Sequence, residues 1–116
     1  MRGVHILADF EECKNKEILI DSKKLEKSVE KLILKNRLSI VGKCFYKFEK
    51  AGVTGIFLIA ESHVSVHTWP EKNNSLNMDI FTCNYQGDNR EKTLALFNDL
   101  KKLFEPEKIT KKIIER

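Results

Sequence analysis

The stretch GIFLIAESHVSVHTWPE, residues 55–71, decides how the chain is expected to fold. Its apolar first half ends at Glu61 and Ser62, after which apolar and polar residues alternate up to Pro70. Alternation of this kind is typical of a strand with one buried face, and Pro70 ends the strand because proline has no N–H to donate. The stretch therefore predicts two consecutive strands, 53–60 and 63–69.

The polar residues of the second strand raise a question about its role. Successive side chains of a strand point to opposite faces, so one face of this strand carries both His63 and His67. Burying such groups without partners is costly, which leaves two interpretations, a polar strand facing solvent or a reaction site. Strict alternation also places Ser62 on the face opposite His67, unless the backbone is irregular at Glu61 and Ser62.

The remaining elements are expected on both sides of this pair of strands. Strands are predicted over 4–10, 38–48, 76–83 and 108–114, and helices over about 22–36 and from 88 onward. Asp21 or Ser22 can cap the first helix, and Asp88 with Glu91 forms a variant of the capping box for the second. The chain is thus expected to be one α+β domain, a two-layer sandwich with a mainly antiparallel sheet and two helices packed on one face. The other sheet face must be solvated or covered by a partner.

Composition excludes several classes of function. The net charge of +4 comes from lysines spread along the chain without a basic block, which argues against nucleic acid as a partner. No apolar run approaches the ~20 residues of a membrane span, so no membrane partner is expected, and the first residues, MRGVHILADF, do not resemble a secretion signal. Three cysteines without CxxC spacing fit a reducing compartment, so a cytoplasmic location is expected.

Two common kinds of reaction site fit the chain poorly. His63 and His67 would lie about 13 Å apart on a strand, too far to share one ion, so no metal is expected. A serine hydrolase is also disfavoured, because the chain has no GxSxG nucleophile elbow.

A set of short motifs runs in order through most of the chain. The motifs are HILADF at 5–10 with Cys13, Phe48, GVTG at 52–55, ESH at 61–63, HTWPE at 67–71 and FTC at 81–83. Together they resemble the prokaryotic-type S-adenosylmethionine decarboxylase proenzymes, which depend on a pyruvoyl group.

The resemblance implies that residues 1–116, a single domain, cut themselves at one bond. The Ser62 hydroxyl would attack the carbonyl of Glu61 and convert the amide into an ester. β-Elimination would then leave a β chain of residues 1–61 and an α chain of residues 62–116 that begins with a pyruvoyl group made from Ser62. Such an acyl shift needs a distorted backbone, and strain of this kind is stored at functional sites.

The resemblance also implies roles for the residues around the cleavage site. His67 corresponds to the base that assists processing, a task suited to an imidazole. A distorted backbone at Ser62 would bring the Ser62 side chain to the sheet face that carries His67. Thr54 corresponds to a small hydroxyl residue near the cleavage site. His63 corresponds to a motif member that supports processing, and its role stays open between positioning the cleavage loop and acting directly.

For decarboxylation, the resemblance implies a Schiff base between the pyruvoyl ketone and the substrate amine, which acts as an electron sink. Cys83 corresponds to the proton donor, Glu71 to the carboxylate that binds the ribose hydroxyls, and Phe48 to the aromatic ring that stacks on adenine. The product is the aminopropyl donor for spermidine synthesis. The family also implies a homodimer of processed protomers, (αβ)₂, with sites near the subunit interface.

Two departures from the family pattern lie next to the expected substrate pocket. Residues 72–77, KNNSLN, stand where relatives carry an aromatic and glycine-rich run, and Asn84 stands where a glycine usually follows the cysteine. Substrate identity therefore stays open between S-adenosylmethionine and, on the same scaffold, arginine or ornithine. A remote alternative is a non-enzymatic paralogue that binds a catalytic partner chain.

Overall fold

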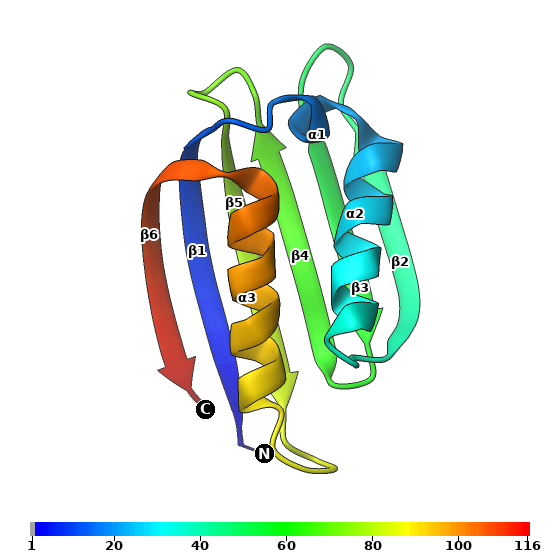
Figure 1. Ribbon diagram of the computed structural model, residues 1–116. Coiled ribbons are helices and arrows are strands. Elements are labelled where there is room, and N and C mark those ends of the chain that lie inside the picture. Colours follow the sequence, from blue (N-terminus) through cyan, green and yellow to red (C-terminus); the bar gives the residue numbers. More distant parts are fainter. Residues whose placement is uncertain (1) are drawn as a thin grey trace.

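The computed structural model describes residues 2–116, which form one six-stranded sheet and three helices (Figure 1). The elements are β1 (Gly3–Cys13), α1 (Glu17–Ile20), α2 (Ser22–Lys35), β2 (Ile40–Lys47), β3 (Val53–Ile59), β4 (Ser62–Trp69), β5 (Ser75–Cys83), α3 (Arg90–Phe104) and β6 (Pro106–Glu115). In space the strands follow the order β2-β3-β4-β5-β1-β6, and every neighbouring pair is antiparallel. The expected α+β sandwich is confirmed, with the short α1 as an additional helix.

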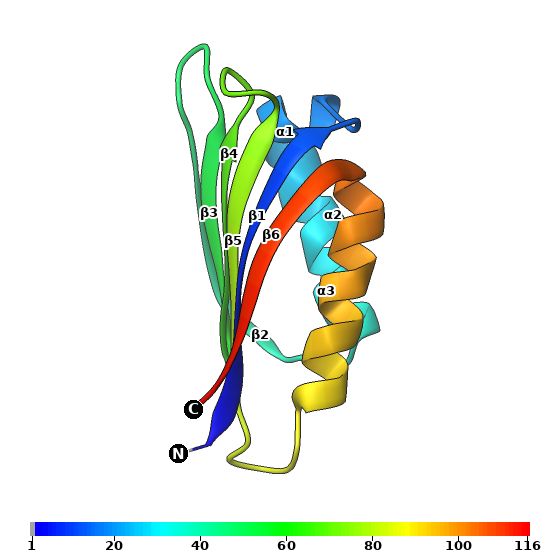
Figure 2. The same ribbon diagram turned by 90° about the vertical axis from the view of Figure 1, so that its left-hand side faces the viewer.

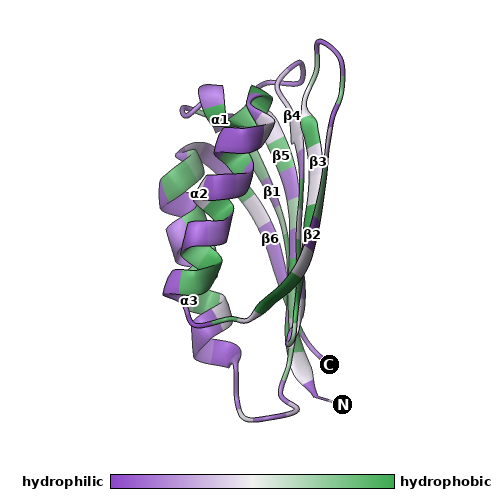
Figure 3. Ribbon diagram, turned by 90° about the vertical axis from the view of Figure 1, so that its right-hand side faces the viewer, coloured by the Kyte–Doolittle hydropathy of each residue, from purple (hydrophilic) through white to green (hydrophobic). Residues whose placement is uncertain are grey.

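The two long helices cover one face of the sheet and leave the other face uncovered (Figure 2). Val64 and Val66 of β4 lie in the buried core, as the alternation of that strand predicted. The helix side of the core is formed by Leu25, Val29 and Ile33 of α2 and Leu96, Phe97, Leu100 and Phe104 of α3. Figure 3 shows apolar and polar residues alternating around both helices, as expected where one side packs on the sheet.

The two helix starts differ in how well the sequence predicted them. The Asp21 side chain caps α2 by accepting an N–H of its first turn at 3.0 Å, as expected. The capping box predicted for α3 is wrong, because Asn89 is the N-cap and Asp88 instead accepts the N–H of Arg90. Glu91 is therefore the second helical residue, one position too early to reach back to the cap.

The turn between β4 and β5 is one residue shorter than the sequence suggested. Ser75 already belongs to β5, whereas the predicted strand began at residue 76 and already contained Asn77. Asn73 and Asn74 form the turn with φ angles of 56° and 47°, left-handed values that asparagine tolerates better than most residues. The N–H of Glu12 donates to the Asn73 carbonyl at 2.9 Å, which ties this turn to the end of β1.

The buried Thr68 hydroxyl links β3, β4 and α1 at one end of the sheet. It accepts the Val53 N–H at 2.8 Å and donates to the Leu19 carbonyl at 2.7 Å. Thr68→Val leaves both backbone groups unpaired, so we expect the free energy of unfolding to fall by about 1–3 kcal/mol. Urea titration of the uncleaved chain, kept intact by Ser62→Ala, measures this. Thr110→Val on the exposed β6 is the matched control, and an equal loss there would contradict the assignment.

Candidate active site

The Glu61–Ser62 bond lies where the β3–β4 hairpin turns. Residues 60–61 form the turn, and Ser62, opposite Ile59, is the first residue of β4. Ser62 has a φ of 153°, a conformation that favours glycine and costs other residues about 1–3 kcal/mol. The backbone irregularity that the sequence left open is therefore present, confined to one strained residue at the expected cleavage junction.

The carbonyl of the same bond faces a backbone donor. The Glu61 carbonyl oxygen accepts the N–H of Cys83, the last residue of β5, at 2.8 Å. A fixed N–H in this position polarises the carbonyl and stabilises negative charge that develops on its oxygen during nucleophilic attack. The pairing of Ser62 with Thr82 brings Cys83, which is half-buried, beside the junction.

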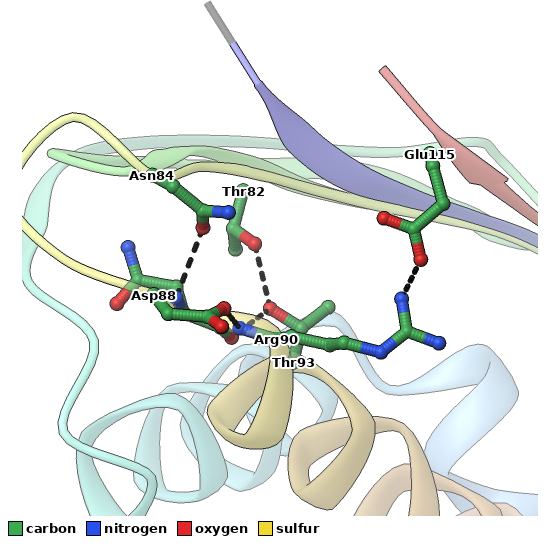
Figure 4. A network of polar contacts seen from close by, with 7 residues as sticks. Thr82, Asn84, Asp88, Arg90, Thr93 and Glu115 are labelled. Carbon is green, nitrogen blue, oxygen red and sulfur yellow. Dashed lines mark hydrogen bonds and ion pairs between the residues drawn. The ribbon is translucent and has the colours of Figure 1, made fainter.

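A polar network joins the end of β5, next to Cys83, to the start of α3 (Figure 4). The Asn89 amide donates to the Cys83 carbonyl at 2.8 Å, and the Asn84 side chain accepts the Asn89 N–H at 2.9 Å. The hydroxyl groups of Thr82 and Thr93 lie 2.7 Å apart and join β5 to α3. Asn84, which departs from the family pattern, thus has a structural partner in this network that a glycine could not provide.

A second group of expected site residues lies toward the opposite end of β4. His67 Nδ1 lies 3.2 Å from Thr54 Oγ1, and the two residues face each other across β3 and β4. Phe48 follows β2, is 46% exposed and packs edge-on against Tyr46 with ring centroids 4.9 Å apart. Glu71 is exposed in the turn that follows β4. The structure therefore brings His67 and Thr54 into contact and places Phe48 and Glu71 toward the same end.

The structure does not bring the two groups together within one chain. β4 runs from the lower to the upper end of the sheet in Figure 1, with Ser62 at its start. Its pairing with β3 is continuous from Ser62 to His67, so five residue steps separate them by about 16 Å. The distorted backbone at Ser62 therefore does not bring the side chains of Ser62 and His67 together. A direct contact between these two residues would need a second chain.

His63 lies on the uncovered face near a histidine that the motif analysis did not single out. The rings of His5 and His63 are 6.2 Å apart, and Phe81 lies 5.3 Å from His5 and 6.0 Å from His63. Burial lowers the pKa of His5, and nearby Arg116 and His63 lower it further, against the opposing effect of Asp79. His5 Nε2 is buried without a hydrogen-bond partner among residues 2–116. The only sequence signal for His5 is its place in the HILADF motif.

Within residues 2–116, no group of three or more His, Cys, Asp or Glu side chains is placed to hold a metal ion. None of the helices in that range is long and apolar enough to cross a membrane.

Comparison with known proteins identifies the family of the chain. The family model described as S-adenosylmethionine decarboxylase matches residues 4–116. The chain belongs to this family. A S-adenosylmethionine decarboxylase proenzyme of Archaeoglobus fulgidus is 42% identical over 116 residues, which cover 98% of this chain and 96% of the relative. A proenzyme of the same name from Thermosipho melanesiensis is 37% identical over 107 residues, or 92% of this chain and 78% of the relative.

A solved structure of the S-adenosylmethionine decarboxylase family shares the fold. The crystal structure of the adenosylmethionine decarboxylase from Aquifex aeolicus superposes with a TM-score of 0.84 at 30% identity, covering 98% of this chain and 89% of that one. The resemblance read from the motifs is thus confirmed. Since the relatives are named as proenzymes, the family implies precursor chains that process themselves to a pyruvoyl form.

Proposed function

We propose that this chain is a self-processing, pyruvoyl-dependent S-adenosylmethionine decarboxylase. The observation that carries the proposal is the geometry of the Glu61–Ser62 bond. Its serine is strained, with φ at 153°, and its carbonyl accepts the Cys83 N–H at 2.8 Å. Strain raises the energy of the intact junction, while the N–H stabilises the charge that forms on attack. Both features favour reaction at this bond.

The cleavage step follows from these groups. The Ser62 oxygen bonds to the Glu61 carbonyl carbon, the carbon–nitrogen bond breaks, and the hydroxyl proton passes to the released amine. Loss of the Ser62 α-proton and β-elimination then free the Glu61 carboxylate, which ends the 1–61 chain. Elimination leaves a dehydroalanine at residue 62. Water hydrolyses it and releases its nitrogen as ammonia, so the 62–116 chain begins with a pyruvoyl group.

Cys83 has a second role in the proposed decarboxylation. The pyruvoyl group supplies an electron sink for the electrons released with carbon dioxide. The Cys83 backbone is held by the Glu61 carbonyl and by the Asn89 amide, which fixes the residue next to the junction. We propose that its thiol returns a proton to the substrate α-carbon, as the resemblance implies.

We propose that the working assembly is a homodimer. One chain holds the junction at one end of β4 and the His67–Thr54 pair about 16 Å away. A two-fold axis that lies between the two uncovered sheet faces and runs perpendicular to the strands places opposite ends of two protomers against each other. His67 and Thr54 of one protomer then assist cleavage at Ser62 of the other, and the uncovered face is buried.

The substrate proposal rests on the end of the sheet that carries Phe48 and Glu71. An exposed aromatic ring can stack on adenine, and a carboxylate can accept hydrogen bonds from ribose hydroxyls. No observation favours arginine or ornithine, or a non-enzymatic paralogue. We further propose that the product is the aminopropyl donor for spermidine synthesis. All three cysteines are free, which supports a cytoplasmic location.

Release of labelled carbon dioxide from three substrates tests this function. The processed protein is given carboxyl-labelled S-adenosylmethionine, arginine or ornithine in parallel. We expect S-adenosylmethionine to be turned over at least about 100-fold more efficiently, because arginine and ornithine lack the ribose and adenine that Glu71 and Phe48 are proposed to bind. Faster release from arginine or ornithine would keep the pyruvoyl chemistry and overturn the substrate.

A further inference from the structure

The Glu61 side chain is held by a residue that the proposed mechanism does not use. Ser39, which precedes β2, donates its backbone N–H to Glu61 Oε1 at 3.1 Å and its hydroxyl to Oε2 at 3.3 Å. The Ser39 carbonyl accepts the N–H of Ala60 at 2.7 Å. Three hydrogen bonds thus join one residue to both residues of the cleavage turn.

Together with the Cys83 contact, these hydrogen bonds hold Glu61 from both sides of the β3–β4 hairpin. The β3–β4 hairpin lies between β2 and β5 in the sheet. On one side Ser39 holds the Glu61 carboxylate, and on the other side Cys83 holds the Glu61 carbonyl. Because a peptide unit is planar, a residue fixed at its side chain and its carbonyl has little freedom to turn the following bond away from Ser62.

We propose that Ser39 is a positioning residue for self-cleavage. By holding the Glu61 carboxylate, it keeps the Glu61 carbonyl against the Cys83 N–H, where the Ser62 hydroxyl can attack it. An unattached glutamate side chain samples several rotamers, and ordering it is costly. Paying that cost during folding places the reacting groups before the reaction begins. The inference rests on the proposed self-cleavage and assigns a determinant that lies outside the ESH motif.

The surroundings of the contact suit a carboxylate. A cavity of about 300 Å³ is lined by Arg37 and Lys92 together with Ser39, Glu61 and Cys83. Lys92 reaches the Arg37 carbonyl at 3.5 Å, so its ammonium group lies on this side of the junction. Two positive charges attract a carboxylate at this position, and hydrogen bonds to an ionised group are stronger than neutral ones.

A double-mutant cycle on the self-cleavage rate tests the proposal. Freshly translated chains are followed by denaturing mass spectrometry as the full-length species converts to fragments 1–61 and 62–116. Ser39→Ala removes the hydroxyl but keeps the N–H, so we expect cleavage to slow about fivefold to tenfold. Ser39→Thr keeps both donors and should stay within about twofold of the unmodified chain. Ser28→Ala, on α2, is the control and should have no effect.

The decisive comparison uses Glu61→Ala as the background. If Ser39 acts through the carboxylate, adding Ser39→Ala to Glu61→Ala should not slow cleavage further. An undiminished effect there, or a normal rate for Ser39→Ala alone, overturns the positioning role and leaves the proposed function intact. An unmodified chain that never cleaves overturns the proposed function itself, and the inference with it.

Discussion

Replacing Ser62 by alanine is expected to leave the chain at full length, with no fragment boundary at residue 61 and no decarboxylase activity. Alanine has no oxygen to attack the Glu61 carbonyl, so neither the ester nor the pyruvoyl group can form. The strained φ of 153° and the Cys83 N–H remain, but they assist only an attack that no longer occurs. We expect cleavage to fall below detection, a loss of more than about 1,000-fold. Denaturing mass spectrometry checks this directly.

The matched control is Ser28→Ala, on α2. Its helix covers the face of the sheet that the proposed dimer leaves outside (Figure 2), so cleavage should proceed as in the unmodified chain. Fragments 1–61 and 62–116 from the Ser62→Ala protein would show that another nucleophile cuts this bond, and would contradict the assignment of Ser62.

Most of the fold follows from local sequence signals. The alternation of Val64 and Val66 with polar residues predicted β4 and its buried face, and the helical spacing on α2 and α3 predicted where the helices pack. These signals are strong because a strand or a long helix repeats its pattern several times. The short α1 has only four residues, so it shows no repeat, and the cap of α3 differs by one residue because neighbouring Asp88 and Asn89 are both good capping residues.

The arrangement of the candidate site was less accessible from the sequence. The motif identified the individual residues, and strand parity already indicated that Ser62 and His67 point to opposite faces. The separation of the two groups became visible only with the register of β3, β4 and β5. The contact between Ser39 and Glu61 joins residues 22 positions apart, and one exposed serine before a strand carries no pattern that would reveal it. Long-range contacts of this kind depend on tertiary structure.

The test of the proposed dimer with the largest expected effect on cleavage is complementation between two inactive chains. His67→Ala alone is expected to slow cleavage by about 100-fold to 10,000-fold, the usual contribution of a general base. Co-expression with Ser62→Ala should restore cleavage. In a mixed dimer the His67→Ala chain supplies Ser62 and Cys83, while the Ser62→Ala chain supplies His67 and Thr54. One of the two sites is then complete.

Random pairing fixes the expected yield. With equal amounts of both chains, about half of the His67→Ala chains find a Ser62→Ala partner in a two-fold dimer, so about half of them should be cut. The two chains differ in mass, so mass spectrometry shows which one yields fragment 62–116. Co-expression of His67→Ala with Ser62→Ala/His67→Ala is the control and should yield no rescue. If the true pair also fails, His67 does not act across the interface. Since about 16 Å separates it from Ser62 in one chain, its assignment as the processing base would then be lost as well.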